Sequence, residues 1–179
     1  MKFNNDMLRL YAVTDRHWTG EQTLYEQVRD VLMGGATCLQ LREKDLDEAS
    51  FYEEAKNIKE LCRLFDVPFI INDNVMLAKE IDADGVHVGQ DDMACLKARE
   101  ILGPDKIIGV SAHTIEEARI AKEQGADYLG VGAIFPTSSK DDAEVLGIKR
   151  LKEMTDTVDL PMVAIGGISY DNCLLLKDT

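Results

Sequence analysis

The sequence predicts an α/β fold of the (β/α)8 TIM-barrel type in which the eighth βα unit is missing from this chain. Short apolar runs alternate along the chain with amphipathic helical stretches. A weak repeat at Gly35–Leu39, Asp82–Val86 and Gly125–Leu129 ends a helix and begins a strand each time. The repeats lie about two βα units apart, which favours a barrel over a Rossmann sheet. The glycine-rich motif of a Rossmann sheet is also missing after the first predicted strand, where Thr14-Asp15-Arg16-His17 stands instead.

Seven apolar runs are interpreted as strands because they lack a regular alternation of apolar and polar residues. Strands that are buried on both faces, as in a parallel sheet, have this pattern. The predicted strands are Leu8–Thr14, Cys38–Arg42, Phe69–Asn72, Gly85–Val88, Ile107–Ser111, Tyr128–Val131 and Met162–Ile165.

The stretches between the strands are interpreted as helices. In the longest one, apolar residues recur at steps of three and four and therefore share one face: Phe51, Ala55, Ile58, Cys62 and Phe65. The capping-box pattern Thr114-Ile-Glu-Glu117 predicts that another helix begins just after the fifth strand.

The predicted domain is a single barrel over residues 1–179 that is incomplete at its C-terminal end, because only seven strands precede Thr179. A complete barrel is usually at least about 200 residues long. An open sheet of seven strands exposes the unpaired edges of its first and last strands. We therefore expect lower stability than in a complete barrel. Association of copies would cover the edges, so a homo-oligomer is one expected state.

Composition places the chain among ordinary globular proteins and limits its partners. Hydrophobic residues make up 45% and charged residues 30% of 179 residues, and 20 Lys and Arg against 33 Asp and Glu give a net charge of −13. Such an acidic chain repels nucleic acid and anionic membranes, so phosphates would bind only through a few focused basic side chains. No apolar run is long enough to span a bilayer, and the N-terminus lacks the apolar stretch of a signal peptide.

Cysteine spacing indicates the redox environment. Cys38, Cys62, Cys95 and Cys173 are widely spaced and form no C-x-x-C pair, and the histidines are scattered. This pattern predicts reduced, mostly buried thiols in a cytoplasmic protein, rather than a disulfide framework or a structural zinc site.

Active sites of such barrels form at the C-terminal ends of the strands, so the residues that follow each strand carry the functional prediction. After the second strand, Gln40, Arg42 and Lys44 alternate along the chain and therefore lie on one side. Two cations and an amide on one side suit a multiply charged anion such as a diphosphate. A solvated loop with charges of both signs is an equally open interpretation of this segment.

Acidic residues follow the next two strands, at Asn72-Asp73-Asn74 and Gly89-Gln90-Asp91-Asp92. Carboxylates at neighbouring strand ends can converge on one Mg²⁺, which typically binds one or two carboxylates, phosphate oxygens and water. The alternative is that one acidic or amide side chain in each segment caps the helix that follows.

The last three strands are followed by hydroxyl groups and glycines. Ser111 is a hydrogen-bond donor after the fifth strand, and Thr137-Ser138-Ser139-Lys140 after the sixth is suited to an oxyanion. The Gly166-Gly167 turn after the seventh strand lets backbone N–H groups approach a phosphate closely. We interpret His113 as a loop or packing residue and His87 as a core residue, and no Ser/His/Asp nucleophile arrangement is readable.

Seven segments together resemble the thiamine phosphate synthase (thiamine-phosphate pyrophosphorylase) family. They are Tyr11–Arg16, Gln40–Lys44, Ile71–Asp73, Gly85–Asp92, Gly109–His113, Gly130–Asp141 and Ala164–Ile168, in the order and spacing of the family. The resemblance implies a Mg²⁺-dependent transferase of thiamine biosynthesis. It would condense 4-amino-5-hydroxymethyl-2-methylpyrimidine diphosphate with 4-methyl-5-(2-phosphoethyl)thiazole, with dissociative displacement of diphosphate, to give thiamine phosphate.

The resemblance also implies roles for residues of the matching segments. Asp73 and Asp92 would bind Mg²⁺ on the diphosphate, and Arg42, Lys44 and Lys140 would be the catalytic cations that neutralise the leaving group. Thr137, Ser139 and the main chain of Gly167 would hold the thiazole phosphate. The full set of implied substrate-binding residues is Gln40, Leu41, Arg42, Glu43, Lys44, Asn72, Ser111, Thr137, Ser138, Ser139, Lys140 and Gly167.

Two other functions stay open at this point. A related thiazole tautomerase shares the scaffold but need not keep the diphosphate and metal residues. A truncated, non-catalytic remnant would bind only the pyrimidine diphosphate. The second alternative arises because the eighth unit of the family completes the thiazole phosphate site and nothing after Asn172 supplies it here. Weaker thiazole phosphate binding than in a complete member is therefore expected.

Overall fold

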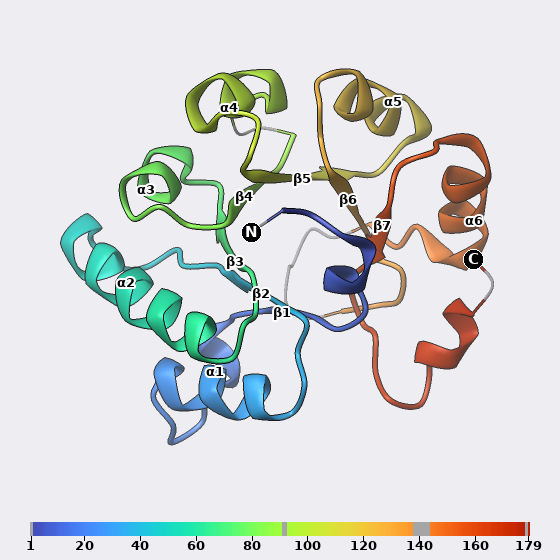
Figure 1. Cartoon of the computed structure of the whole chain (residues 1–179). Helices are drawn as coiled ribbons and strands as arrows, with labels where there is room; N and C mark the ends of the chain where they lie inside the picture. Colours follow the sequence, from blue (N-terminus) through green and yellow to red (C-terminus); the bar gives the residue numbers. More distant parts are fainter. Residues whose placement is uncertain (1, 91–92, 138–143, 178) are drawn as a thin grey trace.

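Seven parallel strands, hydrogen-bonded in chain order, form the sheet of this computed structural model, which describes residues 2–90, 93–137, 144–177 and 179. The strands are β1 (Tyr11–Val13), β2 (Cys38–Leu41), β3 (Phe69–Asn72), β4 (Gly85–Val88), β5 (Ile107–Ala112), β6 (Tyr128–Val131) and β7 (Met162–Ala164). The sheet curves round as a nearly closed barrel (Figure 1). The predicted barrel of seven parallel strands is therefore confirmed.

Helices surround this sheet as an outer ring (Figure 1). They are α1 (Leu24–Met33), α2 (Glu48–Leu64), α3 (Val75–Glu80), α4 (Cys95–Leu102), α5 (Ile115–Glu123) and α6 (Gly147–Thr157), with 3-10 helices η1 (Asn5–Leu8), η2 (Arg16–Trp18) and η3 (Cys173–Leu176). In α2 the predicted apolar face is buried at Ala55, Ile58 and Cys62, whereas Phe65 follows the end of the helix and is partly exposed. Among the described residues, no helix is both long and apolar enough to cross a membrane.

The apolar core has two parts, one on each side of the sheet. The larger part lies between the strands and the helices and includes Leu39 and Leu41 of β2. The smaller part fills the barrel itself and includes Cys38 and Tyr128, the first residues of β2 and β6. The ring of Phe3 stacks on Tyr128, so the N-terminal segment covers this end of the barrel, in the middle of the ring of strands (Figure 1). The opposite, C-terminal end of the strands remains for the site.

The two edge strands differ from the inner ones in burial. Every residue of β1 and β7 is half-buried, whereas β2, β4 and β6 are fully buried. Among the described residues, β1 pairs with β2 and β7 pairs with β6, each on one side. After β7 the chain forms the short 3-10 helix η3.

Candidate active site

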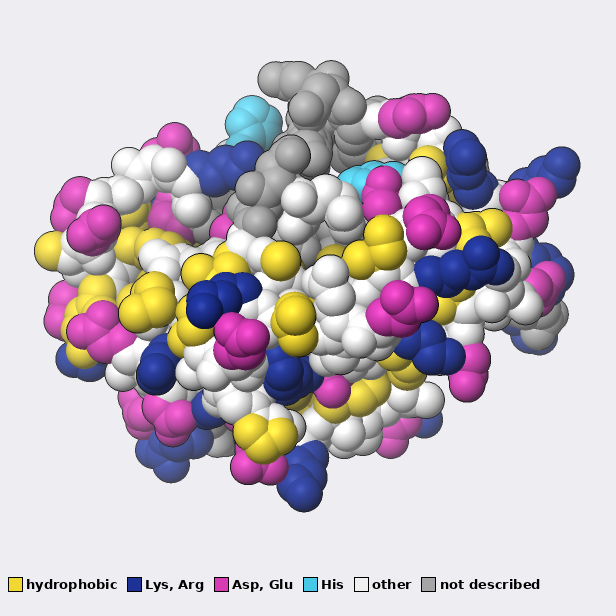
Figure 2. Space-filling view, turned by 90° about the horizontal axis from the view of Figure 1, so that it is seen from above, with side chains coloured by type: hydrophobic (Ala, Val, Ile, Leu, Met, Phe, Trp, Pro, Cys, Tyr) yellow, Lys and Arg dark blue, Asp and Glu magenta, His cyan; other side chains and the backbone are white. Residues whose placement is uncertain are grey.

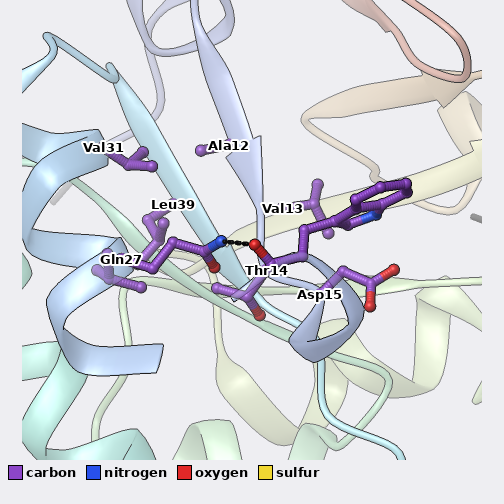
Figure 3. Close-up of a pocket in the computed structure, with 9 residues that line it drawn as sticks. Ala12, Val13, Thr14, Asp15, Gln27, Val31 and Leu39 are labelled. Carbon is purple, nitrogen blue, oxygen red and sulfur yellow. Dashed lines mark hydrogen bonds between the residues drawn. The ribbon is translucent and has the colours of Figure 1, made fainter. Parts of the chain in front are cut away.

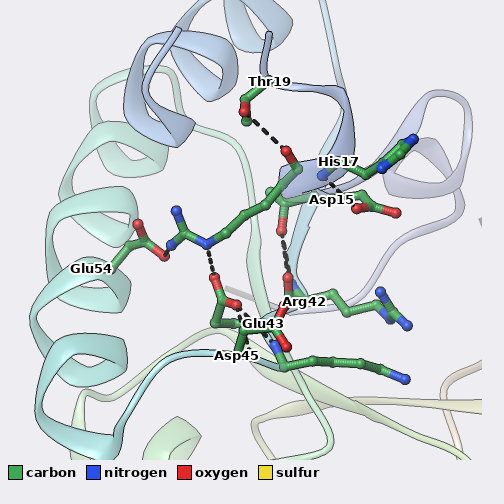
Figure 4. Close-up of polar contacts among 10 residues, drawn as sticks. Asp15, His17, Thr19, Arg42, Glu43, Asp45 and Glu54 are labelled. Carbon is green, nitrogen blue, oxygen red and sulfur yellow. Dashed lines mark hydrogen bonds and ion pairs between the residues drawn. The ribbon is translucent and has the colours of Figure 1, made fainter. Parts of the chain in front are cut away.

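The end of β2 presents the predicted anion-binding cations. Arg42 is half-buried and Lys44 is exposed. The backbone of Arg42 is fixed on both sides by the buried Thr14, whose hydroxyl accepts from the Arg42 N–H at 2.9 Å and donates to the Arg42 carbonyl at 3.1 Å. Figure 4 shows the Arg42 side chain extending away from the cluster formed by Arg16, Glu43 and Glu54.

The residues on either side of Arg42, Leu41 and Glu43, face elsewhere. Leu41 is completely buried in the core between sheet and helices, so its side chain does not face the mouth of the barrel, contrary to a side-chain role in substrate binding. Glu43 turns its carboxylate to the Arg16 guanidinium, which also donates to Glu54 on α2 (Figure 4). Strand periodicity explains both orientations, because residues 41 and 43 alternate with 40, 42 and 44.

Gln40 lies inside the barrel, below the mouth. It is 5% exposed, and its amide donates to the Tyr11 hydroxyl at 2.9 Å. The Tyr11 and Tyr128 hydroxyls are 2.6 Å apart, Tyr128 is 3.1 Å from Nδ1 of His87, and Nε2 of His87 is 3.0 Å from the Ser111 hydroxyl. Two predicted substrate residues, Gln40 and Ser111, are therefore joined by one hydrogen-bonded chain through the barrel, in which His87 is a core residue as predicted.

Tyr11 and Tyr128, the two tyrosines of this hydrogen-bonded chain, are both held in their neutral form. Burial raises the pKa of Tyr11 well above its usual value, and it raises the pKa of Tyr128 in the same direction. Desolvation is the main cause in each case, because a phenolate loses the hydration that stabilises its charge. The two phenol groups therefore act as neutral hydrogen-bonding groups at ordinary pH.

The acidic segment after β3 separates into two roles. Asn74 caps α3, because its side chain accepts from the Leu77 N–H at 2.9 Å. Asp73 adopts a left-handed backbone conformation with φ of +63°, and its N–H donates to the His87 carbonyl at 2.8 Å. The Asn72 amide donates to the Asp73 carboxylate at 2.6 Å. Capping thus explains Asn74 and does not explain Asp73, which is exposed at the end of the strand.

The loop after β4 is joined to the end of β5 at the mouth. The Gln90 side-chain amide donates to the Ser111 carbonyl at 2.6 Å, and Ser111 itself is half-buried. The predicted metal ligand Asp92 lies outside the described residues. Among the described residues, no group of three potential metal-ligating side chains occurs. His113 is exposed and binds Glu117 within its own loop and helix, as expected of a loop residue.

The loops after β6 and β7 run side by side. The N–H groups of Ile134 and Phe135 donate to the carbonyls of Ile165 and Gly166 at 2.9 and 3.0 Å. A Cβ on Gly166 would lie 2.5 Å from the Ala133 Cβ, so a side chain has no room there. This pairing brings the segment that leads to Thr137 next to Gly167. The predicted residues Ser138, Ser139 and Lys140 lie outside the described residues.

A cavity of about 140 Å³ lies away from these groups, between the edge strand β1 and helix α1 (Figure 3). Its walls are mainly apolar and include Ala12, Val31 and Leu39, and the Gln27 amide donates to the Trp18 carbonyl at 3.1 Å beside it. Thr14 and Asp15 at the end of β1 line this cavity, but none of the predicted site residues that the structure describes does, so it is not the predicted site.

Outside the mouth, charge is mixed. On the face in Figure 2, acidic and basic side chains are interspersed around small apolar areas. What distinguishes the cations Arg42 and Lys44 is therefore their position at the end of a strand, and not membership in a basic surface patch.

Comparison with known proteins decides the family. The sequence model of the family described as thiamine monophosphate synthase matches residues 10–179, a range that includes all seven strands. This chain belongs to the thiamine monophosphate synthase family. The resemblance of the seven sequence segments is thereby confirmed.

Individual members of the family are similar over almost the whole chain. Thiamine-phosphate synthase of Clostridium acetobutylicum is 50% identical over 171 residues, which cover 96% of this chain and 81% of the relative. The thiamine-phosphate synthase of Methanobrevibacter smithii is 47% identical over 175 residues, covering 98% and 83%. Thiamine phosphate pyrophosphorylase from Pyrococcus furiosus superposes with a TM-score of 0.86 at 41% identity, covering 96% and 81%.

Sequence reasoning missed several residues that support the site in this member of the thiamine monophosphate synthase family. Thr14 and Arg16 were noted only as members of the segment Tyr11–Arg16 and were given no role, although both contact the loop after β2. Tyr11 and Tyr128 were assigned to strands without a polar role. The period-two pattern could have indicated that Glu43 faces away from Arg42, but no spacing signal identifies its partner 27 residues earlier.

Proposed function

We propose that this chain joins 4-amino-5-hydroxymethyl-2-methylpyrimidine diphosphate to 4-methyl-5-(2-phosphoethyl)thiazole and releases diphosphate and thiamine phosphate. The observation that carries the proposal is the arrangement at the strand ends, where two cations of the β2 loop and an acidic residue after β3 follow adjacent strands. The names of relatives about half identical in sequence support the same reaction.

The pyrimidine diphosphate would be bound at the ends of β2, β3 and β5. Arg42 and Lys44 would meet the diphosphate oxygens, because a guanidinium and an ammonium match a multiply charged anion. Asn72 and Ser111 would supply neutral hydrogen bonds. Gln40 and Ser111 would be held in place by the hydrogen-bonded chain between them. Lys140, which lies outside the described residues, would be a third cation on the leaving group.

The residues after β3 fit a magnesium ion on the diphosphate. Mg²⁺ prefers hard oxygen ligands and usually binds one or two carboxylates together with substrate phosphates and water. Asp73 offers an exposed carboxylate at a strand end, oriented by the Asn72 amide. Asp92 would be the second carboxylate. Bound there, Mg²⁺ would neutralise charge on the diphosphate.

The thiazole phosphate would be bound by the paired loops after β6 and β7. Thr137 offers a hydroxyl group and Gly167 a backbone N–H, and Gly167 has a φ of +64° that favours glycine. Ser138 and Ser139, outside the described residues, would complete this subsite. A phosphate held here would place the thiazole ring opposite the pyrimidine.

The chemistry needs alignment and charge neutralisation rather than a protein nucleophile. The bond between the exocyclic CH₂ of the pyrimidine and the diphosphate oxygen breaks, and its electron pair leaves with the diphosphate. Arg42 and Lys44 stabilise the charge that grows on this leaving group. The thiazole nitrogen then forms a bond to the same CH₂, so the second task of the site is to hold that nitrogen in line.

Mg²⁺-dependent release of diphosphate in the presence of both substrates tests the proposal. Asp73→Asn is the sharpest variant, because asparagine tolerates the positive φ of this position and removes only the charge. We expect loss of Mg²⁺-dependent turnover with an unchanged fold. Asp66→Asn is a matched control, since Asp66 is exposed and also has a positive φ of 55°, before β3 rather than after it.

Three results would contradict the proposal. Full activity of Asp73→Asn would show that the Asp73 carboxylate is not the metal ligand that we assign. Binding of the pyrimidine diphosphate without turnover would favour the non-catalytic remnant. Isomerisation of a thiazole without diphosphate release would favour the tautomerase.

We further infer a cytoplasmic location and association of copies as a homo-oligomer. Four free cysteines, three of them buried, agree with a reducing compartment. The half-buried edge strands β1 and β7 offer backbone groups to a second copy. Sedimentation velocity at two protein concentrations checks the oligomeric state.

A further inference from the structure

An ion cluster lies directly behind the cations of the β2 loop. The Arg16 guanidinium, at the start of η2, donates through Nε to Glu43 and through Nη2 to Glu54 on α2 (Figure 4). The Glu43 side chain is 3% exposed, so its charge depends on Arg16 for compensation. Partial burial works against a charged Arg16, but its hydrogen bonds to Glu54 and Glu43 outweigh this effect and raise the pKa of Arg16.

Glu43 connects this ion pair to the main chain of the loop. One carboxylate oxygen accepts from Arg16, and the other accepts from the N–H groups of Lys44 at 2.9 Å and Asp45 at 3.1 Å. Both oxygens of the buried carboxylate are therefore occupied. Rotation of Glu43 away from Arg16 would leave a buried charge without its partner, which is strongly unfavourable.

Thr14 fixes the preceding residue of the same loop, through its two hydrogen bonds to the Arg42 backbone. The segment Thr14–Arg16 therefore holds the loop from Arg42 to Asp45 at both ends. Without this support, the two cations would have to lose backbone freedom when an anion binds, and the affinity would fall.

We propose that Arg16 and Glu43 are positioning residues for the pyrimidine diphosphate, and that their ion pair holds Arg42 and Lys44 in the orientation that meets the diphosphate. This inference rests on the proposed function, in which Arg42 and Lys44 bind that group. Neither Arg16 nor Glu43 touches the substrate. The binding role implied for Glu43 by the family resemblance is thus replaced by an indirect one.

The test compares the KM values of the two substrates in Arg16→Ala and Glu43→Gln. Glutamine keeps an oxygen for the two backbone N–H groups and loses the charge that pairs with Arg16. We expect the KM for the pyrimidine diphosphate to rise about tenfold, as is typical when a group that orients a ligand-binding residue is removed. The KM for the thiazole phosphate should stay within about twofold of the parent value, because its subsite lies at β6 and β7.

Arg63→Ala is the matched control, because it removes an exposed arginine that pairs with Glu60 on the outer face of α2. Its KM values should equal those of the parent protein. Calorimetric titration with inorganic diphosphate and Mg²⁺ gives a second readout, in which both test variants should bind about tenfold more weakly. Arg16→Lys keeps the charge and should restore part of the affinity.

A merely structural role would lower kcat through a smaller folded fraction and leave both KM values unchanged, and this result would overturn the inference. If Arg16→Ala does not fold, Glu43→Gln decides alone, since it retains the Arg16–Glu54 pair. Arg42→Ala separates this inference from the proposed function. A raised pyrimidine diphosphate KM in Arg42→Ala with parental values in the two test variants overturns only the positioning role. A parental value in Arg42→Ala overturns both.

Discussion

The hydroxyl groups of Tyr11 and Tyr128 lie 2.6 Å apart inside the barrel, although 117 residues separate them in the chain. Tyr11 begins the edge strand β1, and Tyr128 begins β6, across the barrel. Their hydrogen bond closes a polar connection across an interior that is otherwise apolar, and the Tyr128 hydroxyl also meets Nδ1 of His87. The edge strand β1 is thus attached to the barrel from inside as well as through its pairing with β2.

Tyr128→Phe should destabilise the protein measurably. It removes the shared hydroxyl, so Tyr11 and His87 each lose one of their buried hydrogen bonds while Tyr11 keeps Gln40 and His87 keeps Ser111. Loss of a buried hydrogen-bond partner costs about 1–3 kcal/mol. For a chain of this size, each 1 kcal/mol lowers the melting temperature by about 2–4 °C. Differential scanning calorimetry of the variant and the parent measures the difference.

Tyr170→Phe is the control for this substitution. Tyr170 is 94% exposed, so loss of its hydroxyl should change stability by less than about 0.5 kcal/mol. Equal melting temperatures of the Tyr128→Phe variant and the parent would show that the interior hydrogen bonds contribute nothing to stability.

Gly109→Ala should be more severe than Tyr128→Phe. A Cβ at position 109 would overlap the Tyr128 ring and approach Nδ1 of His87 to 2.5 Å, and both rings are buried. The position of Gly130 on β6 is similarly crowded, because a Cβ there would lie 2.9 Å from Cε1 of His87. Overpacking a core usually costs about 1–3 kcal/mol, and more where the neighbours cannot move. Denaturant unfolding checks this prediction. An alanine variant as stable as the parent would mean that the rings shift freely.

The fold was predictable because buried parallel strands are visible as apolar runs. The bounds of Phe69–Asn72, Gly85–Val88 and Tyr128–Val131 agree with the observed strands. The prediction for the first strand, Leu8–Thr14, was too long. Leu8 belongs to η1, and its side chain packs against the cluster inside the barrel. An apolar residue type predicts burial, but it does not predict which backbone conformation buries the side chain.

For the candidate site, the residues that follow each strand were predictable, but the contacts between residues far apart in the chain were not. The alternation of residues 40, 42 and 44 indicated which side chains share a face. In the segment after β3, the observed cap assigns Asn74 to helix capping, and the metal role of Asp73 stays a prediction. The contacts of Glu43 with Arg16 and of Tyr128 with Tyr11 were not predictable, since the partners lie 27 and 117 residues away and only the folded sheet brings them together. The Thr114 cap was local and was predicted, although the Glu117 carboxylate binds His113 instead of Thr114.

Alkaline pH should weaken the fold through its buried thiols. Burial raises the pKa of Cys38 and of Cys62 to about 12, and that of Cys95 to about 11. An unfolded thiol has a pKa of about 8.5, so above that pH the unfolded state releases protons that the folded state keeps. The stabilisation is therefore fully present below about pH 8.5 and is lost as pH rises toward 12. Urea midpoints at pH 7.5 and 10 should show this decrease.

Single cysteine variants identify the source of that decrease. Cys62→Ala should reduce the difference between the two midpoints, whereas the exposed Cys173→Ala should not change it. Iodoacetamide at pH 8 should accordingly modify Cys173 in the folded protein and all four cysteines in urea, as measured by intact mass. Rapid modification of Cys38 or Cys62 in the folded state would contradict the raised pKa values.

Gly167→Ala should separate the two substrate subsites. The residue has a φ of +64°, which strains any side chain, and a Cβ would overlap the Pro136 carbonyl and lie 2.8 Å from the Phe135 Cβ. The β7 loop must therefore move away from the β6 loop, and the Gly167 N–H moves with it. The KM for the thiazole phosphate should rise about tenfold or more, since misplacement by about 1 Å can cost 10²-fold. The KM for the pyrimidine diphosphate should stay near the parent value, because Arg42 and Asp73 are on other strands. Equal increases in both KM values would show that the loops after β6 and β7 serve the whole mouth rather than one phosphate.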